Sequence, residues 1–429
     1  MLLSIYIENF RSIKEPLTID LTPTSLKGFK DNLGRINRYK YLKTGVIYGP
    51  NASGKSNILR ALKALEYLVN VSGEYKPGEK IEPYEPFKLC PECAKKPTTI
   101  GIEFIAKDNI KYSYFIGYYE KSFIREELYF FPKNHKTLLF LREKEVPIKF
   151  GETYRGGQKT IENQLLQNQL FITKAAVNNS LSVQAPFLYF VKSLVIYPFL
   201  EVYRENTLLK RLYASRISDN KHALFADRFN KLICALDTGI EKITSEEVEW
   251  EKYKFPTNIS DNIRKKIQED FKYNIKTYHR SYENEQRLVI FDIEDESAGT
   301  QSLLFMAGLI LDALDEGSVI IVDEFEKNLH PGITQYLIKL FQNPITNPNH
   351  AQLLFATHDI TQLNNQVFRR DQVWFTEKDE KGITTIFRCS EIKGLRLNTP
   401  IDKWYSSGRL GATPIINDLD FLLSMQSKK

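Results

Sequence analysis

The chain opens with two stretches in which apolar and polar residues alternate, 3–7 and 17–21. Alternation with a period of two is typical of strands with one buried face, so these stretches predict a β-hairpin. A short apolar run at 45–48 follows, and apolar residues then recur at three- and four-residue steps. This change of period predicts a strand, a glycine-rich loop and a helix over residues 44–70.

The middle of the chain divides into two parts. Between residues 98 and 150 apolar and polar residues alternate again, which predicts an antiparallel β subdomain. From 161 to 285 the two kinds of residue mix at helical spacing, which predicts a helical lobe.

The last third returns to alternating strands and helices. The expected elements are a strand at 286–293, a buried helix at 301–314, an apolar strand at 318–322, a helix at 331–341 and strands at 352–356 and 372–376. Strands and helices that alternate at both ends of the chain imply a mixed α/β fold with one parallel sheet built from the two ends. We therefore expect an N-terminal half over 1–160, an inserted helical lobe over 161–285 and a C-terminal half over 286–429.

Composition excludes several classes of protein. The 429 residues are 42% hydrophobic and 26% charged, with a net charge of +6, as in folded proteins of two to three domains. This basic bias is too weak to identify a nucleic-acid binder. We expect a cytoplasmic protein without a membrane span, because the chain has four cysteines, no export signal and no apolar run of membrane length.

The strongest local motif is Gly49-Pro50-Asn51-Ala52-Ser53-Gly54-Lys55-Ser56, which matches G-x-x-x-x-G-K-[ST] between a predicted strand and helix. In such a loop, backbone amides surround phosphate oxygens, the lysine reaches the β- and γ-phosphates of ATP, and the serine hydroxyl binds Mg²⁺. The expected phosphate-binding residues are Gly49, Asn51, Ala52, Ser53, Gly54, Lys55, Ser56 and Asn57.

A second motif is the apolar run 319–322, which ends in Asp323 and Glu324. Beside a phosphate-binding loop, carboxylates at such a strand end hold Mg²⁺ and polarise the attacking water. Asp323 is therefore the expected magnesium ligand and Glu324 the expected general base.

His358 follows another apolar strand, at its carboxyl end, where open α/β sheets bind ligands. We expect it to sense the γ-phosphate of ATP.

The segment 296–301, Glu-Ser-Ala-Gly-Thr-Gln, precedes the buried helix. A serine and a glycine at a helix N-terminus can form an anion site. The same residues can also be an ordinary N-cap, made by Ser297 or Thr300.

In their order along the chain, these motifs resemble those of ABC-type P-loop ATPases, in the branch that includes SMC, RecF and OLD-like AAA ATPases. The resemblance is greatest to bacterial OLD-like ATPases of abortive-infection and other anti-phage operons. The segments that carry it are Asn9 to Ser12, Asp323 to Pro331, Ala356 to Asp359, the E-S-x-G-T signature, Arg369 to Phe375 and Tyr405 to Pro414.

The resemblance implies a homodimer, or a higher homo-oligomer, with two ATP molecules held between two heads. Ser297, Gly299 and Thr300 would contact the ATP of the partner protomer. Ala298 and Thr300 depart from the L-S-G-G-Q form, where glycine and glutamine stand. Arg11 resembles a phosphate-contacting arginine of the SMC branch, but it also fits an exposed hairpin arginine.

Two other features allow two interpretations each. Cys90-Pro91-Glu92-Cys93 resembles half of a zinc hook, but Cys234 and Cys389 are too distant in sequence to complete a site, so a plain loop is favoured. The helical lobe contains clusters of cations, such as Lys210-Arg211 and Arg264 to Lys266, together with tyrosines such as Tyr273 and Tyr278. They can follow a nucleic-acid backbone, which leaves DNA a possible partner, although the accompanying acidic residues favour a solvated surface.

By the same resemblance, the protein would be an ATPase that controls an effector encoded by a neighbouring gene, such as a Toprim-type or RloB-like nuclease. The 71 residues after His358 (429 − 358) are too few for a Toprim domain, so no nuclease activity of its own is expected. The alternatives are a RecF-like or SMC-like DNA-binding repair ATPase and an ATP-gated scaffold with nearly silent hydrolysis.

Overall fold

The computed structural model describes residues 1–429 except 198–210, 237, 254, 257–258, 397–398, 415–417, 419–424 and 426–429. Lys210, named above, therefore lies outside the described residues. The chain forms two compact units, one of residues 1–194 and 353–429 and the other of residues 195–352.

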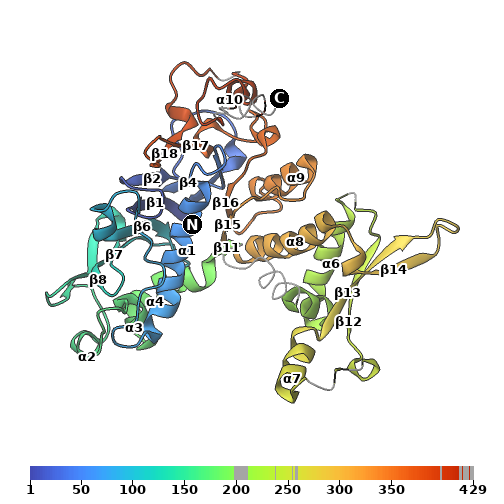
Figure 1. Ribbon diagram of the computed structural model, residues 1–429, viewed down its shortest axis with the longest axis horizontal. Helices are drawn as coiled ribbons and strands as arrows, with labels where there is room; N and C mark the ends of the chain where they lie inside the picture. Colours follow the sequence, from blue (N-terminus) through green and yellow to red (C-terminus); the bar gives the residue numbers. More distant parts are fainter. Residues whose placement is uncertain are drawn as a thin grey trace. The chain divides into compact units, whose positions relative to one another are not determined.

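The first unit contains a seven-stranded antiparallel sheet with the strand order β10-β9-β8-β7-β6-β1-β2 (Figure 1). Its strands are β1 (Leu2–Glu8), β2 (Leu17–Asp20), β6 (Thr98–Ile105), β7 (Lys111–Tyr118), β8 (Phe123–Phe130), β9 (Thr137–Glu143) and β10 (Lys149–Phe150). The opening hairpin and the antiparallel subdomain are both confirmed. They also share one sheet, because β1 pairs with β6, with Ile5 opposite Ile102.

The same unit contains a second group of strands in the order β16-β5-β17-β18: β16 (Gln352–Ala356), β5 (Thr44–Tyr48), β17 (Val373–Lys378) and β18 (Thr384–Arg388). β5 pairs in parallel with both β16 and β17, while β18 is antiparallel to β17. Every residue of β5 is buried, as expected for a strand covered on both faces. The expected sheet built from the two ends of the chain is confirmed, and it is parallel except for β18.

The α-helices of this unit are α1 (Lys55–Val71), α2 (Lys159–Asn163), α3 (Phe171–Val177), α4 (Leu181–Leu188) and α10 (Ile401–Ser406). The shorter elements are a two-stranded sheet of β3 (Leu33–Ile36) and β4 (Tyr39–Leu42), a π-helix at Tyr189–Ser193, and 3₁₀ turns at Lys30–Asn32, Ser72–Glu74, Cys93–Lys95, Pro132–Asn134, Ile360–Gln362, Arg370–Gln372 and Cys389–Glu391. α1 packs against α3 and β6. Stacked aromatic rings fill the adjacent core, where Phe104 and Tyr189 have centroids 4.1 Å apart.

The second unit contains β11 (Leu194–Tyr197), β15 (Val319–Val322), α6 (Ala223–Cys234), α7 (Asp261–Asp270), α8 (Ala298–Glu316) and α9 (Pro331–Gln342). Residues 211–218 are also helical, and 3₁₀ turns span Asn220–His222, Trp250–Lys252 and Ile293–Asp295. α6 packs on α8. The ring of Tyr213 covers Gly308 of α8 so closely that a Cβ there would lie 2.4 Å from it.

The lobe expected to be helical over 161–285 is only partly so. Besides its helices it contains β12 (Lys242–Glu247) and β13 (Tyr273–Arg280), which form an antiparallel sheet with β14 (Leu288–Asp292) in the order β12-β13-β14. Few side chains of β12 are buried, so its sequence lacks the regular apolar alternation that would have distinguished a strand from a helix.

Among the described residues, no helix has the length and apolar character needed to cross a bilayer.

Candidate nucleotide site

The glycine-rich loop lies between β5 and α1, as its motif requires. β5 ends at Tyr48, and α1 begins at Lys55 with Gly54 as its N-cap. The first amides of a helix have no carbonyl partner within it, so the N-terminus of α1 presents donors and partial positive charge to an anion.

Gly49 and Gly54 allow neighbouring side chains to pack directly against the backbone of the loop. Gly49 and Gly54 have φ angles of 155° and 114°, which favour glycine. A Cβ at Gly49 would lie 2.3 Å from Thr376 Oγ1, and one at Gly54 would lie 2.2 Å from Thr384 Oγ1. The ends of β17 and β18 therefore support the loop from outside.

Lys55 reaches back across the loop that precedes it. Its Nζ donates to the carbonyls of Gly49 at 2.8 Å and Pro50 at 3.1 Å, and lies 3.5 Å from Nδ1 of His358. Only 5% of the lysine is exposed. The structure thus brings together two of the expected catalytic residues, from opposite ends of the sequence.

His358 is positioned by the turn that follows β16. The Thr357 amide donates to the Ile47 carbonyl at 3.2 Å, and the Asp359 amide donates to Thr357 Oγ1 at 2.9 Å. The Tyr48 hydroxyl donates to the Asp359 carbonyl at 3.2 Å. β5 therefore anchors both the phosphate-binding loop and the histidine turn.

Hydroxyl groups outside the sequence motifs also hold the loop. Thr384 Oγ1 lies 2.7 Å from both the Ser53 carbonyl and Ser12 Oγ, and Ser12 Oγ accepts from Asn57 Nδ2 at 2.7 Å. Thr376 Oγ1 lies 2.7 Å from Ser53 Oγ. Thr376 could have been found from the sequence, because it is a polar residue at the end of a predicted strand. No local pattern identifies Thr384.

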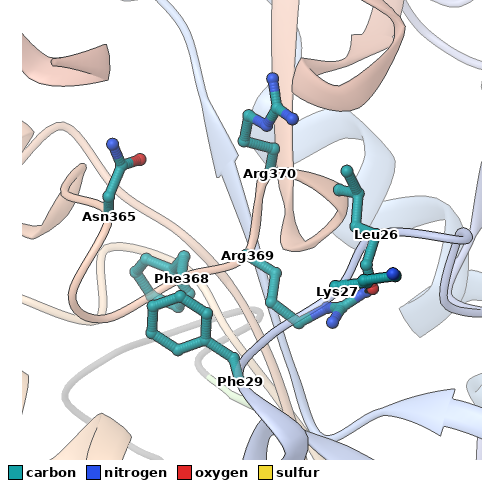
Figure 2. A pocket seen from close by; sticks show the side chains of 7 residues that line it. All are labelled: Leu26, Lys27, Phe29, Asn365, Phe368, Arg369 and Arg370. Atoms are coloured by element: carbon teal, nitrogen blue, oxygen red, sulfur yellow. Dashed lines mark hydrogen bonds between the residues drawn. The ribbon is translucent and has the colours of Figure 1, made fainter. Parts of the chain in front are cut away.

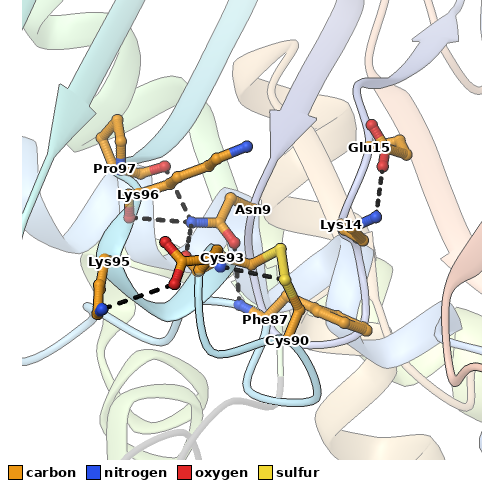
Figure 3. Close-up of a disulfide and its surroundings, with 10 residues drawn as sticks. Asn9, Lys14, Glu15, Phe87, Cys90, Cys93, Lys95, Lys96 and Pro97 are labelled. Atoms are coloured by element: carbon orange, nitrogen blue, oxygen red, sulfur yellow. Dashed lines mark hydrogen bonds and ion pairs between the residues drawn. A yellow bond between two sulfur atoms is a disulfide. The ribbon is translucent and has the colours of Figure 1, made fainter.

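Arg11 forms a bidentate ion pair with Glu85, with two nitrogen–oxygen distances of 2.7 Å. Next to it, Asn9 Nδ2 donates to the carbonyls of Cys93, Lys96 and Pro97 (Figure 3). These contacts fasten the Asn9 to Ser12 turn to the loop that precedes β6.

Cys90 and Cys93 form a disulfide with each other within that loop (Figure 3). Within the described part of the chain, no group of three or more His, Cys, Asp or Glu side chains is placed to hold a metal ion. The zinc interpretation of these cysteines gains no support.

Asp323 and Glu324 follow β15 in the second unit. The Asp323 amide donates to the Tyr197 carbonyl at 3.1 Å, which joins the end of β15 to β11. Glu324 has a φ of 53°, a left-handed value that is uncommon for glutamate. Its exposed carboxylate lies 3.2 Å from Lys327 Nζ.

The signature segment begins α8, also in the second unit. Ser297 is its N-cap, since Ser297 Oγ accepts from the Thr300 amide at 3.1 Å. A Cβ at Gly299 would lie 2.6 Å from the Asn328 carbonyl, so packing within the chain itself requires a glycine at this position. Of the two possible capping residues, Ser297 is the one that caps; a role in binding the partner's ATP stays a prediction.

Glu296, just before this cap, is fixed by the neighbouring sheet. Its Oε1 accepts from Thr277 Oγ1 at 2.5 Å and lies 2.7 Å from His279 Nε2. Gln301 Nε2 donates to the Glu296 carbonyl at 2.9 Å. β13 therefore holds the start of the signature segment.

The Arg369 to Phe375 motif is a buried structural network. Arg369 donates to both carboxylate oxygens of Asp371 at 2.8 Å, and Asp371 Oδ2 also accepts from the amide and hydroxyl of Thr24 at 2.8 Å. Burial opposes ionisation of Asp371, but these hydrogen bonds outweigh it and hold its pKa below the usual value. Arg369 also lines a small pocket with Phe29 and Phe368 (Figure 2).

The tail motif, Tyr405 to Pro414, docks on β17. The Tyr405 ring stacks on Phe375 with centroids 5.3 Å apart, and its hydroxyl donates to the Ala412 carbonyl at 2.8 Å. Burial raises the pKa of Tyr405 to about 12.

The residues around the glycine-rich loop fit a bound polyphosphate. The glycines leave room for close backbone approach, and Lys55 supplies a nearly buried cation that donates to two carbonyls of the loop itself. Ser56 lies in the first turn of α1, at the mouth of the loop. Asp323 belongs to the second unit, so the joint Mg²⁺ site stays a prediction.

Comparison with known proteins gave one family match and several structural similarities. The family model described as "AAA domain, putative AbiEii toxin, Type IV TA system" matches residues 46–364. The SMC head domain from Thermotoga maritima is 14% identical with a TM-score of 0.40, and the matched region covers 90% of this chain and 98% of that one. The Pyrococcus furiosus Smc head bound to the C-terminal domain of ScpA is 10% identical with a TM-score of 0.42, covering 91% and 97%.

The recombination mediator RecF, in a structure with ATP, is 13% identical with a TM-score of 0.39, covering 90% of this chain and 99% of that one. No curated protein matches the chain.

Proposed function

Because the chain belongs to the AAA-domain family whose model matches residues 46–364, we propose that it is an ABC-type P-loop ATPase that acts as an ATP-dependent switch. In this proposal it binds Mg-ATP, dimerises on it, hydrolyses it slowly, and controls a separately encoded effector, a nuclease, in anti-phage defence. The nuclease activity belongs to the effector and not to this chain.

One observation carries the ATPase part of the proposal. Lys55 and His358 come from opposite ends of the sequence and meet at 3.5 Å beside a loop whose glycines are needed for close approach. Such a cluster positions a cation and an imidazole at the terminal phosphate of a nucleotide.

Each site residue then has a chemical role. Lys55 binds the β- and γ-phosphates, and the Ser56 hydroxyl and Asp323 would hold Mg²⁺, which neutralises charge on the phosphates when it is bound. Glu324 accepts a proton from the water whose oxygen attacks the γ-phosphorus. The bond between that phosphorus and the bridging oxygen breaks, and ADP leaves.

The second active surface comes from the partner protomer. Ser297, Gly299 and Thr300 would bind the γ-phosphate of the other head, so that hydrolysis requires two chains. The exposed N-terminus of α8, with its serine cap, has the donors that this contact needs.

The defence role rests on the family, which is described as a putative toxin of a type IV toxin–antitoxin system. A toxin–antitoxin pair consists of two separately encoded gene products. An ATPase that changes its oligomeric state with nucleotide is suited to restrain such a partner and then release it.

The test uses Glu324→Gln, which keeps the shape of the side chain but cannot accept the proton. Mass photometry with and without Mg-ATP should show a stable dimer of the variant, while the wild-type dimer decays as ATP is consumed. The control is Glu326→Gln, a neighbouring acid without an assigned role. Normal turnover by Glu324→Gln would remove this residue as general base.

The effector is tested by co-expressing the neighbouring gene with this chain. A complex whose mass changes with ATP is expected. Failure to recover that gene product, together with salt-dependent DNA binding stimulated by ATP, would instead support a DNA repair ATPase.

A further inference from the structure

The edge strand β14 exposes four consecutive apolar residues. Leu288, Val289, Ile290 and Phe291 are 40%, 39%, 56% and 40% exposed, and β14 is the last strand of the order β12-β13-β14. Natural proteins usually protect such an edge with charge, proline or a covering element, because unprotected edges pair with other strands. An apolar edge with this exposure therefore indicates an interaction surface.

The hydrogen-bonding register of β14 identifies which backbone groups face outward. The Ser281 amide donates to the Arg287 carbonyl at 2.8 Å, at the closed end of the β13–β14 hairpin. Hydrogen-bonded pairs alternate along an antiparallel ladder, so the backbone groups of Leu288 and Ile290 point away from β13. They are placed to pair with an added strand.

Both faces of β14 are apolar. Val289 and Phe291 lie on the face shared with His279, while Leu288 and Ile290 lie on the opposite face. A flat partner surface would cover only one of these faces. A strand that pairs with the edge brings its own side chains to both faces and so fits better.

We propose that β14 pairs with β14 of a second copy of this chain, antiparallel, about a two-fold axis at Ile290. The strand spans Leu288–Asp292 and Ile290 is its central residue, so an axis there pairs the two copies of β14 along their whole length. The outward-facing Ile290 backbone groups of the two copies then bond each other, and Val289 lies opposite Phe291 of the partner.

A hollow beside the strand supports this register. It has a volume of about 400 Å³ and is lined by Val289, Phe291, His279, Tyr282 and Glu296, among others. Because Val289 lies opposite the partner's Phe291, that aromatic ring enters the hollow. A proline-rich or polar peptide would bring no such ring.

This contact needs no nucleotide, and it is therefore separate from the ATP-linked dimer proposed above. It also lies close to the signature segment, since Glu296 lines the same hollow. Pairing at β14 would thus fix the sheet that holds the start of α8.

The experiment is sedimentation velocity of the full chain carrying Lys55→Ala, without nucleotide, over a range of protein concentrations. A concentration-dependent dimer is expected. Ile290→Lys should raise its Kd more than about tenfold, because two like charges then meet at the axis. The matched control is Ile345→Lys, an equally apolar and 86% exposed position elsewhere in the same unit, which should leave the Kd unchanged.

A cross-link tests the register. In a Cys234→Ser background, a mixture of Val289→Cys and Phe291→Cys chains should form more covalent dimer than either variant alone. A chain that stays monomeric without nucleotide, or a dimer that Ile290→Lys leaves intact, would overturn the proposal. Either result leaves the ATP-linked dimer of Glu324→Gln untouched. Equal melting temperatures of the two lysine variants would show that both fold.

Discussion

Lys55 and His358 lie 303 positions apart in sequence, yet their side-chain nitrogens are 3.5 Å apart. The parallel pairing of β5 with β16 brings them together, because the loop after each strand starts from the same edge of the sheet. Two groups at this spacing can act on one phosphate.

Replacing His358 tests that arrangement. His358→Ala should lower the kcat of ATP hydrolysis about 10²-fold while changing the nucleotide Kd little, because Lys55 and the loop still bind the phosphates. His135→Ala, at an exposed position in the same unit, is the control. A loss of affinity without a loss of kcat would make His358 a binding residue only.

Thr384 is expected to support the loop from β18. Thr384→Val keeps the shape but removes the hydroxyl that lies 2.7 Å from the Ser53 carbonyl. We expect a loss of about 1–3 kcal/mol in the free energy of unfolding and weaker ATP binding. Thr385→Val, the exposed neighbour on β18, should change neither quantity. Chemical denaturation and nucleotide titration measure the two effects.

Glu296 is a positioning residue for the signature segment. Glu296→Ala removes the carboxylate that Thr277 and His279 hold, and should lower kcat about tenfold or more with little change in nucleotide affinity. Glu296→Gln keeps an acceptor oxygen and should recover much of the rate.

A mixing experiment separates this role from simple misfolding. Lys55→Ala chains have an intact signature, and Glu296→Ala chains have an intact phosphate loop. If the signature acts on the partner's ATP, the mixture should hydrolyse ATP faster than either variant alone. Simple additivity of the two residual rates would argue against action across the dimer.

The lowered pKa of Asp371 predicts that the free energy of unfolding depends on pH. Its pKa is lowered in the folded chain, so its contribution to stability is present above the unfolded value of about 4 and is lost as pH falls through the folded value. Asp371→Asn should cost about 3 kcal/mol at pH 7, because it leaves Arg369 buried without its carboxylate.

The measurement is urea denaturation from pH 7 to pH 3. The difference in free energy of unfolding between wild type and Asp371→Asn should shrink as the pH falls. A difference that stays constant with pH would contradict the ionic role of Asp371.

Local patterns predicted most of the fold. The strand at 352–356 matches β16 at both ends, and α1, α8 and α9 lie within a few residues of their expected positions. These elements are strongly apolar and periodic, so tertiary contacts reinforce what the sequence already favours. The strand expected at 286–293 is confirmed as β14, but its partners β12 and β13 were not anticipated, because β12 has one buried residue and no clear alternation.

The site was predictable only where it follows a motif. The loop around Lys55 could be found because its spacing reflects the chemistry of phosphate binding. Ser12, Thr376 and Thr384 support the same loop from distant parts of the sequence, and only the folded chain brings them there. Arg369 and Asp371 belong to a recognisable motif, but their burial shows that this motif maintains the fold.

The Asn328 carbonyl lies where a side chain at position 299 would be, and this closeness has a mechanical consequence. Asn328 lies four positions after Glu324, and Gly299 lies in the first turn of α8. Because Gly299 has no side chain, the loop that follows Glu324 packs directly against the N-terminal turn of α8. A shift of that loop would therefore displace this turn. Glu324 and the start of α8 are therefore coupled within one chain, and this coupling would link the proposed general base to the surface proposed to bind the partner's nucleotide.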